Sequence, residues 1–128
     1  MYRVVIVDDS LVSGLLLKHL VNHVAGVGAI AFQTPLDALT HCALAVPDVV
    51  VVDYKMPSLD GLTFVEALRS LPGCADIPVV MVTGEPGIRS HALALGFDAV
   101  LGKPVEPAFV RETVIRLLPR RPLAAAAG

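Results

Sequence analysis

The chain has 128 residues, of which 55% are hydrophobic and 17% are charged, and its formal net charge at pH 7 is −2. This length fits one domain with a buried core, and the high apolar fraction excludes an intrinsically disordered chain. The slightly negative charge argues against direct binding of nucleic acid, and no segment approaches the roughly 18 consecutive apolar residues that a membrane-spanning helix needs.

Short apolar runs alternate with amphipathic stretches along the whole chain. The expected strands cover residues 3–7, 29–33, 49–53, 78–83 and 99–101. The expected helices cover residues 11–24, 35–45, 62–71, 88–95 and 107–118. This regular alternation predicts an α/β fold, a doubly wound five-stranded parallel sheet with helices on both faces. For such a (βα)5 flavodoxin-like chain, the natural strand order is 2-1-3-4-5.

We expect residues 1–118 to form a single domain. Residues 119–128 lack hydrophobic periodicity and end in four alanines and a glycine. A segment of this kind is typical of a frayed C-terminal tail, or of the start of a truncated linker.

Three aspartates follow apolar runs that are typical of buried strands. Residues 4–7 lead into Asp8 and Asp9, and residues 49–52 lead into Asp53. The predicted strand order makes these two strands neighbours at the switch point of the sheet, where open α/β sheets bind ligands. Clustered carboxylates repel one another unless a cation lies among them, and a site of oxygen ligands suits Mg²⁺. The pattern therefore indicates phosphate chemistry, although a single aspartate at a strand end more often caps the next helix.

Four short motifs stand at expected strand ends in a fixed order. They are Val7-Asp8-Asp9-Ser10, Val52-Asp53-Tyr54-Lys55-Met56-Pro57 with Asp60-Gly61, Val82-Thr83-Gly84, and Leu101-Gly102-Lys103-Pro104. Together they closely resemble the receiver domain of bacterial two-component response regulators, over about residues 3–118. Each motif is weak by itself, and their order and context make the resemblance specific.

The resemblance implies that Asp53 is the phosphoacceptor, whose carboxylate attacks a phosphohistidine and becomes an aspartyl phosphate. Asp9 and Asp53 would bind Mg²⁺ directly, together with the backbone carbonyl of Lys55, and Asp8 would act through water. Mn²⁺ could replace Mg²⁺. The metal would hold the phosphoryl oxygens and offset charge in the transition state.

The same resemblance assigns roles to residues after the fourth and fifth strands. Lys103 would donate a charge-assisted hydrogen bond to one phosphoryl oxygen. Thr83 would move its hydroxyl onto another oxygen, with the Gly84 N–H nearby. The Lys103–Pro104 peptide bond is expected to be cis, a conformation found mainly before proline.

The implied function is signalling and not enzymatic turnover. A sensor histidine kinase or a histidine phosphotransfer protein would phosphorylate Asp53, and phosphorylation would change partner binding or output. The resemblance also allows a homodimer.

The expected first helix is apolar around more than one face, which suggests a docking surface that a partner helix approaches closely at Gly14. The chain lacks the layout of a signal peptide at its start, so we expect a cytoplasmic protein that contacts neither nucleic acid nor membrane directly.

Two departures from the family pattern concern how the domain would signal. Receivers usually carry Tyr or Phe three residues before the conserved lysine, but here that residue is Val100. The usual aromatic rotamer switch cannot operate, so backbone shifts or another side chain must report phosphorylation. The interval from Thr83 to Lys103 also looks short for the family, and we expect a shortened fourth helix after Pro86-Gly87.

Lys55 and Glu85 lie two residues after the phosphoacceptor and the switch threonine, respectively. In receivers these positions flank the phosphoryl group and influence its hydrolysis. We hypothesise that the two side chains pair across the mouth of the pocket and slow the approach of water. The alternative is two independent, solvated charges.

Two other functions compete with a receiver. A Mg²⁺-dependent phosphohydrolase with an aspartyl nucleophile usually carries that residue after the first strand, a second acid two residues later, and an inserted cap. The adjacent Asp8 and Asp9 and the lack of a cap insertion argue against such an enzyme. A phosphorylation-independent scaffold is the third interpretation, and Val100 keeps it open.

Overall fold

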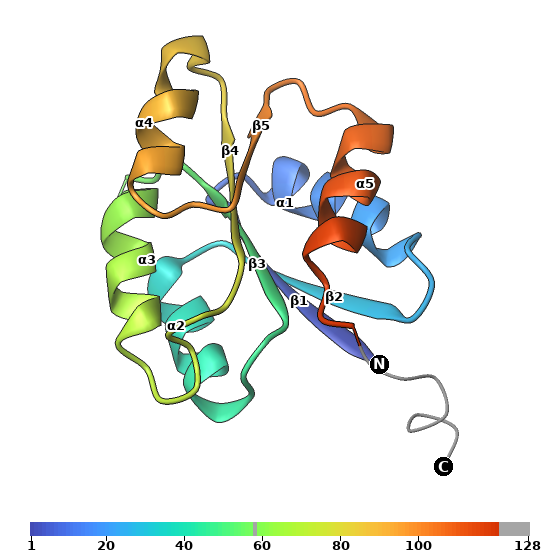
Figure 1. Ribbon diagram of the computed structural model, residues 1–128, viewed down its shortest axis with the longest axis vertical. Coiled ribbons are helices and arrows are strands. Elements are labelled where there is room, and N and C mark those ends of the chain that lie inside the picture. The colour runs from blue at the N-terminus through green and yellow to red at the C-terminus, as the bar shows by residue number, and fades with distance from the viewer. Residues whose placement is uncertain (58, 121–128) are drawn as a thin grey trace.

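The computed structural model describes residues 1–57 and 59–120 of the chain. These residues form strands and helices that alternate along the sequence (Figure 1). The strands are β1 (Tyr2–Val7), β2 (Val27–Phe32), β3 (Val49–Asp53), β4 (Val79–Thr83) and β5 (Ala99–Gly102). The helices are α1 (Leu11–Asn22), α2 (Pro35–Leu44), α3 (Gly61–Arg69), α4 (Arg89–Ala94) and α5 (Pro107–Leu117), and a 3₁₀ turn, η1 (Pro86–Ile88), precedes α4.

The strands form one parallel sheet in the order β2-β1-β3-β4-β5, which confirms the predicted topology. Helices α1 and α5 cover one face of the sheet, and α2, α3 and α4 cover the other (Figure 1). The winding direction changes between β1 and β3. The carboxyl ends of these two strands therefore flank the crevice in which folds of this class bind ligands.

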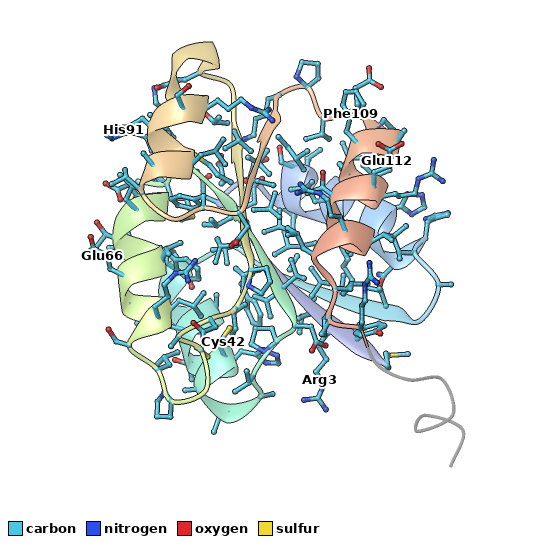
Figure 2. The ribbon with its side chains drawn as sticks, in the orientation of Figure 1. Arg3, Cys42, Glu66, His91, Phe109 and Glu112 are labelled. Carbon is cyan, nitrogen blue, oxygen red and sulfur yellow. The ribbon has the colours of Figure 1, made fainter. Side chains whose placement is uncertain are left out.

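Alternate side chains of each strand point into different cores, one on either face of the sheet. Phe64 of α3 is buried in the core under α2, α3 and α4, and Leu17 and Val114 are buried in the core under α1 and α5. Valine dominates the central strands because a sheet that is covered on both faces favours β-branched residues throughout. Glu66 and His91 point away from the sheet on the outer side of α3 and α4 (Figure 2).

Every predicted boundary of these strands and helices lies within two residues of the observed one. The second strand begins at Val27, two residues before the prediction, because Val27 pairs with Tyr2 and Gly26 takes up the turn with a φ of 79°. The fourth helix is short, as predicted, with six residues in α4. Of the predicted tail, residues 121–128 lie outside the described residues.

Both cysteines of the chain are buried and unpaired, and Cys42 points into the interior (Figure 2). Burial, together with the nearby Cys74, raises the pKa of the Cys42 thiol to about 11. Burial also raises the pKa of Cys74. In the part of the chain that the structure describes, no helix has the length and apolar character needed to cross a membrane.

Candidate functional site

The register of the sheet brings the predicted aspartates together. Val7 pairs with Val52, so the residues that follow them, Asp8 and Asp53, lie side by side at the ends of β1 and β3. Asp9 lies in the loop between β1 and α1. One carboxylate oxygen from each of the three aspartates lies within 4.8 Å of the other two. The chain therefore builds a compact anionic cluster from two segments that are distant in sequence.

Asp8 is almost fully buried, with 1% of its surface exposed. Its Oδ1 accepts a hydrogen bond from the Ser10 N–H at 2.9 Å, whereas its Oδ2 has no partner among the residues that the structure describes. Burial raises the pKa of Asp8, and the Ser10 N–H and the charge of Lys103 oppose that rise. Because an unpartnered buried carboxylate oxygen is unfavourable, this position favours a cation or a water molecule beside it.

Asp53 is 6% exposed, and its Oδ1 lies 3.1 Å from Lys103 Nζ. Burial raises the pKa of Asp53. The hydrogen bond and the charge of Lys103 oppose this rise, and the negative charges of Asp8 and Asp9 add to it. Lys103 follows β5, and the Lys103–Pro104 peptide bond is cis. The ammonium thus compensates the charge of the central carboxylate without neutralising the whole cluster.

Thr83 ends β4, the strand between β3 and β5, and 5% of its surface is exposed. Its Oγ1 accepts a hydrogen bond from the Glu85 N–H at 3.0 Å, and its carbonyl accepts one from the Lys103 N–H at 2.9 Å. A cavity of about 370 Å³ is lined by Asp53, Lys55, Thr83, Gly84, Glu85 and Lys103. The cavity thus brings the predicted phosphoacceptor together with the predicted phosphoryl-binding groups.

Lys55 and Glu85 form an ion pair beside this cavity. The pairing predicted from the sequence is therefore present. Hydrogen bonding and charge from Glu85 raise the pKa of Lys55. Their side chains are 75% and 43% exposed, so the pair contributes little to folding stability.

Gly61 allows the start of α3 to approach the strand that carries Asp53. A Cβ at this position would lie 3.3 Å from the Asp53 carbonyl oxygen and from Tyr54 Cα. Asp60 caps α3, because its Oδ1 accepts a hydrogen bond from the Thr63 N–H at 2.8 Å. The Asp60-Gly61 pair thus shapes the loop and starts the helix.

Arg89, the first residue of α4, is a feature that the sequence did not reveal. Its Nη1 donates a hydrogen bond to the Val100 carbonyl at 3.3 Å. A second cavity, of about 390 Å³, lies beside this contact and is lined by Thr83, Gly84, Glu85, Arg89, Val100, Gly102 and Lys103. No sequence pattern marks Arg89, because its contact with Val100 depends on how two separate segments meet in space.

The donor set of the acidic cluster suits a hard divalent cation. Oxygen ligands, negative charge and the unpartnered Oδ2 of Asp8 are the features that Mg²⁺ or Mn²⁺ would satisfy. An adjoining open cavity of about 420 Å³ gives access from the side of Asp9 and is lined by Asp9, Tyr54, Lys55, Met56, Pro57 and Asp60. An ion with its own water shell could therefore reach the carboxylates.

The first helix exposes an apolar surface, as its sequence predicts. The exposed residues are Leu11, Val12, Leu15 and Leu16. The expectation that Gly14 admits a partner helix is wrong, however. Gly14 lies on the buried face of α1, where a Cβ would lie 3.7 Å from Asp8 Cβ and 3.8 Å from Ala31 Cβ. Its missing side chain faces the sheet and not a partner.

Residues 4–115 match the family described as response regulator receiver domain. The chain is 38% identical over 122 residues to the cyclic di-GMP phosphodiesterase response regulator RpfG of Xanthomonas campestris, and the match covers 93% of this chain and 32% of that protein. It is 36% identical over 110 residues to protein-glutamate methylesterase/protein-glutamine glutaminase 2 of Burkholderia thailandensis, covering 82% of this chain and 30% of that protein. The chain thus spans about a third of the length of these curated relatives.

The fold is also similar to solved structures along nearly its whole length. The chemotaxis protein CheY4 of Vibrio cholerae superposes with a TM-score of 0.83 at 30% identity, covering 92% of this chain and 99% of that one. The signal receiver domain of a signal transduction histidine kinase from Syntrophus aciditrophicus superposes with a TM-score of 0.79 at 28% identity, covering 92% and 90%. The family match includes every strand end that carries a residue of the acidic cluster or its neighbouring cavity.

Proposed function

This chain belongs to the response regulator receiver domains of two-component signalling, and from that membership we propose that Asp53 is its phosphoacceptor. The observation that carries the proposal is the contact between Asp53 and Lys103 inside the acidic cluster. Asp53 supplies the nucleophile and Lys103 the compensating ammonium, and the acidic cluster around them provides an environment that can bind a cation. We assign this function to residues 1–118.

The reaction is transfer of a phosphoryl group from a phosphohistidine. A carboxylate oxygen of Asp53 forms a bond to phosphorus as the phosphorus–nitrogen bond breaks, and the imidazole leaves with the electron pair of that bond. Lys103 offsets the charge on the transferring group through a charge-assisted hydrogen bond. The Thr83 hydroxyl and the Gly84 N–H bind the remaining phosphoryl oxygens.

The acidic cluster serves as a Mg²⁺ site, in which Mn²⁺ can substitute. Asp9, Asp53 and the backbone carbonyl of Lys55 would hold the ion, and Asp8 would act through a water molecule. When bound, the ion supplies positive charge that stabilises the transferring phosphoryl group. The carboxylates of Asp8 and Asp9 would hold the ion near the nucleophile, and they take no covalent part in the transfer.

The phosphodonor is a sensor histidine kinase or a histidine phosphotransfer protein. Its helices would dock on the exposed apolar surface of α1, which begins directly after Asp9 and Ser10. Phosphorylation of the domain changes partner binding or output, and formation of a homodimer is one such change. The domain catalyses no turnover of an external substrate. A cytoplasmic location, without direct contact to nucleic acid, belongs to the same proposal.

The pair formed by Lys55 and Glu85 controls the lifetime of the aspartyl phosphate. Both residues line the cavity that contains Asp53, and their side chains meet at its exposed edge. A closed pair restricts the path by which water reaches the phosphorus on the side opposite Asp53. Opening the pair therefore accelerates hydrolysis.

The family match and the fold favour a receiver over a phosphohydrolase. The nucleophile of the proposed reaction lies at the end of the third strand, and the described residues contain no inserted cap domain between the strands. A phosphorylation-independent scaffold is also disfavoured, because the acidic cluster, Thr83 and Lys103 surround one cavity.

Incubation with Mg²⁺ and acetyl phosphate, followed by intact mass measurement, tests this function. Wild type gains the mass of one phosphoryl group, Asp53→Asn gains none, and the exposed control variant Asp76→Asn behaves as wild type. Labelling that persists in Asp53→Asn would refute the assignment. Continuous turnover of a generic phosphate ester would instead identify a phosphohydrolase, and the size of the labelled protein in solution reports whether it dimerises.

A further inference from the structure

The cavity beside Val100 connects the phosphoryl-binding groups to the start of α4. It shares Thr83, Gly84, Glu85 and Lys103 with the cavity that contains Asp53. Its far side is formed by Arg89 and Val100. Because this space is open, and not filled by a large side chain, a rearrangement near Thr83 can be accommodated without displacing the core.

Arg89 holds the first turn of α4 against β5. The hydrogen bond from Arg89 Nη1 to the Val100 carbonyl is 3.3 Å long, just beyond the usual range for N–H···O contacts, and is only partly buried. A contact of this kind is favourable but easily broken. The hydrogen bond can therefore be formed in one conformation of the domain and broken in another, and we call such a contact a latch.

The segment that leads into Arg89 is attached to groups that face the phosphoacceptor. The Glu85 N–H donates to Thr83 Oγ1 at 3.0 Å, and the Glu85 side chain pairs with Lys55. Glu85 directly precedes the η1 turn, and η1 runs without a break into α4. Any movement of the Thr83 hydroxyl thus acts on the residues that position Arg89.

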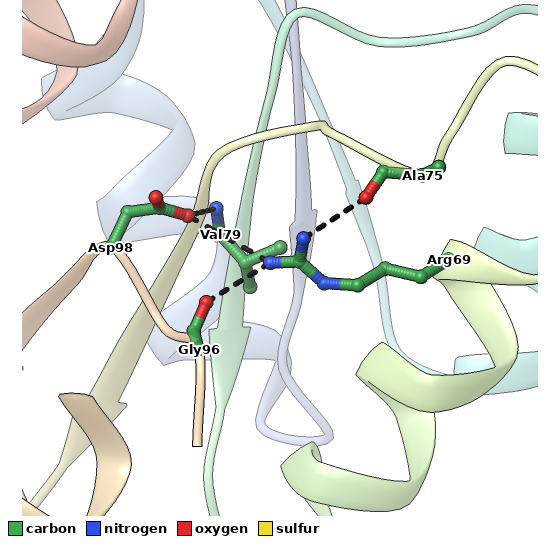
Figure 3. Close-up of polar contacts among 5 residues, drawn as sticks. All are labelled: Arg69, Ala75, Val79, Gly96 and Asp98. Atoms are coloured by element: carbon green, nitrogen blue, oxygen red, sulfur yellow. Dashed lines mark hydrogen bonds and ion pairs between the residues drawn. The ribbon is translucent and has the colours of Figure 1, made fainter. Parts of the chain in front are cut away.

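The opposite end of α4 is fixed by Arg69 of α3. Arg69 donates hydrogen bonds at 3.1 Å to the carbonyls of Ala75 and Gly96 and pairs with Asp98 at 3.8 Å (Figure 3). Asp98 in turn accepts a hydrogen bond at 2.8 Å from the Val79 N–H, at the start of β4. This network ties the loop after α4 to the end of the sheet far from Asp53, and it provides a fixed point for movement of the helix.

Resting on the proposed phosphorylation of Asp53, we propose that Arg89 is the side chain that reports the phosphorylation state of this domain. A phosphoryl group on Asp53 offers new acceptor oxygens to the Thr83 hydroxyl, which turns toward them and leaves the Glu85 N–H. The segment 85–88 is then released, and Arg89 leaves the Val100 carbonyl. The first turn of α4 swings away from β5, while the Arg69 network holds its other end.

The test compares amide hydrogen exchange with and without Mg²⁺ and beryllofluoride, a non-covalent mimic of the phosphoryl group. The proteins are wild type, Arg89→Ala and, as a matched control, Arg111→Ala, which removes an exposed arginine of α5. In wild type, beryllofluoride accelerates exchange in residues 85–95 and leaves residues 96–98 unchanged. In Arg89→Ala, exchange in residues 85–95 is already fast without beryllofluoride, and Arg111→Ala behaves as wild type.

Affinity for beryllofluoride separates a latch from a merely structural contact. Because the latch stabilises the resting state, its removal favours the state that binds beryllofluoride, so Arg89→Ala binds it more tightly, by about two- to tenfold. A structural role would leave the affinity unchanged or lower it, and either result overturns the inference. The inference is also overturned if wild type binds beryllofluoride but amide exchange in residues 85–95 does not change. If wild type takes up neither beryllofluoride nor a phosphoryl group, the proposed function itself fails, and the inference falls with it.

Discussion

Lys103 Nζ lies 3.1 Å from Asp53 Oδ1, although Asp53 ends β3, Lys103 follows β5, and β4 lies between these two strands in the sheet. The contact therefore depends on the register of three strands, and the ammonium reaches across the end of β4 to the carboxylate. It places a positive charge beside the oxygen atoms on which charge develops during phosphoryl transfer.

We expect Lys103→Gln to slow labelling by acetyl phosphate on the order of a hundredfold, because a neutral amide offsets less of the developing charge. The fold should persist, since 35% of the Lys103 side chain is exposed. A time course of intact mass in the presence of Mg²⁺ measures the rate. Lys18→Gln, which changes a lysine of α1, serves as the control, and equal rates for the two variants would contradict the role of Lys103.

Replacing Asp8 by Asn should stabilise the metal-free protein at neutral pH by on the order of 1 kcal/mol, because it removes a buried charge with an unpartnered oxygen. The variant should also bind Mg²⁺ more weakly. Urea unfolding with and without Mg²⁺ measures both effects. A destabilised metal-free variant would show that the charge of Asp8 is already compensated.

The advantage of Asp8→Asn should decrease as the pH falls. Folding raises the pKa of Asp8, so the folded protein binds a proton more readily than the unfolded chain does. The stability that Asp8 contributes in its protonated form is present at low pH, and it is lost as the pH rises through the folded pKa. Unfolding free energies of wild type and variant should therefore converge toward about pH 4.

We expect Lys55→Ala and Glu85→Ala each to shorten the lifetime of the aspartyl phosphate several-fold, with little change in thermal stability, because both side chains are exposed. The double variant should decay no faster than either single variant, since the residues act as one pair. Decay of the labelled mass after removal of acetyl phosphate gives the lifetime. Unchanged lifetimes would mean that the pair does not restrict water.

Gly14 and Gly61 should respond to alanine in opposite directions. At Gly14 a Cβ makes ordinary contacts of 3.7 Å and longer, so alanine should stabilise the helix by about 0.5–1 kcal/mol. At Gly61 a Cβ lies 3.3 Å from backbone atoms of Asp53 and Tyr54, so alanine should destabilise the fold by about 1 kcal/mol and weaken Mg²⁺ binding. Melting temperatures measure the change in stability of each variant, and Mg²⁺ titrations measure the change in metal affinity. Equal responses would show that the loop before α3 adapts freely.

The fold and the acidic cluster are predictable because they follow from local rules that agree with one another. Five strand–helix units in alternation imply the observed strand order, and that order makes the strands before Asp8 and Asp53 neighbours. The valine run before Asp53 gives the third strand its observed bounds. The absent aromatic at Val100 is also visible in the sequence alone.

The remaining features depend on how distant segments pack. An apolar helix such as α1 has more than one candidate inner face, so the burial of Gly14 against Asp8 and Ala31 appears only in three dimensions. Arg69 and Arg89 resemble ordinary surface arginines in the sequence. Their roles follow from backbone carbonyls that the loops and strands present to them, and no side-chain pattern encodes those carbonyls.

The burial of Cys42 and Cys74 makes the domain convenient for site-specific labelling. Thiol reagents attack the thiolate, and a thiol with a pKa of about 11 inside the core is protonated and inaccessible at neutral pH. A cysteine introduced at the exposed Ala94 of α4 would therefore react alone, without removal of the native cysteines. A fluorophore or spin label attached there would follow the helix in an otherwise native protein.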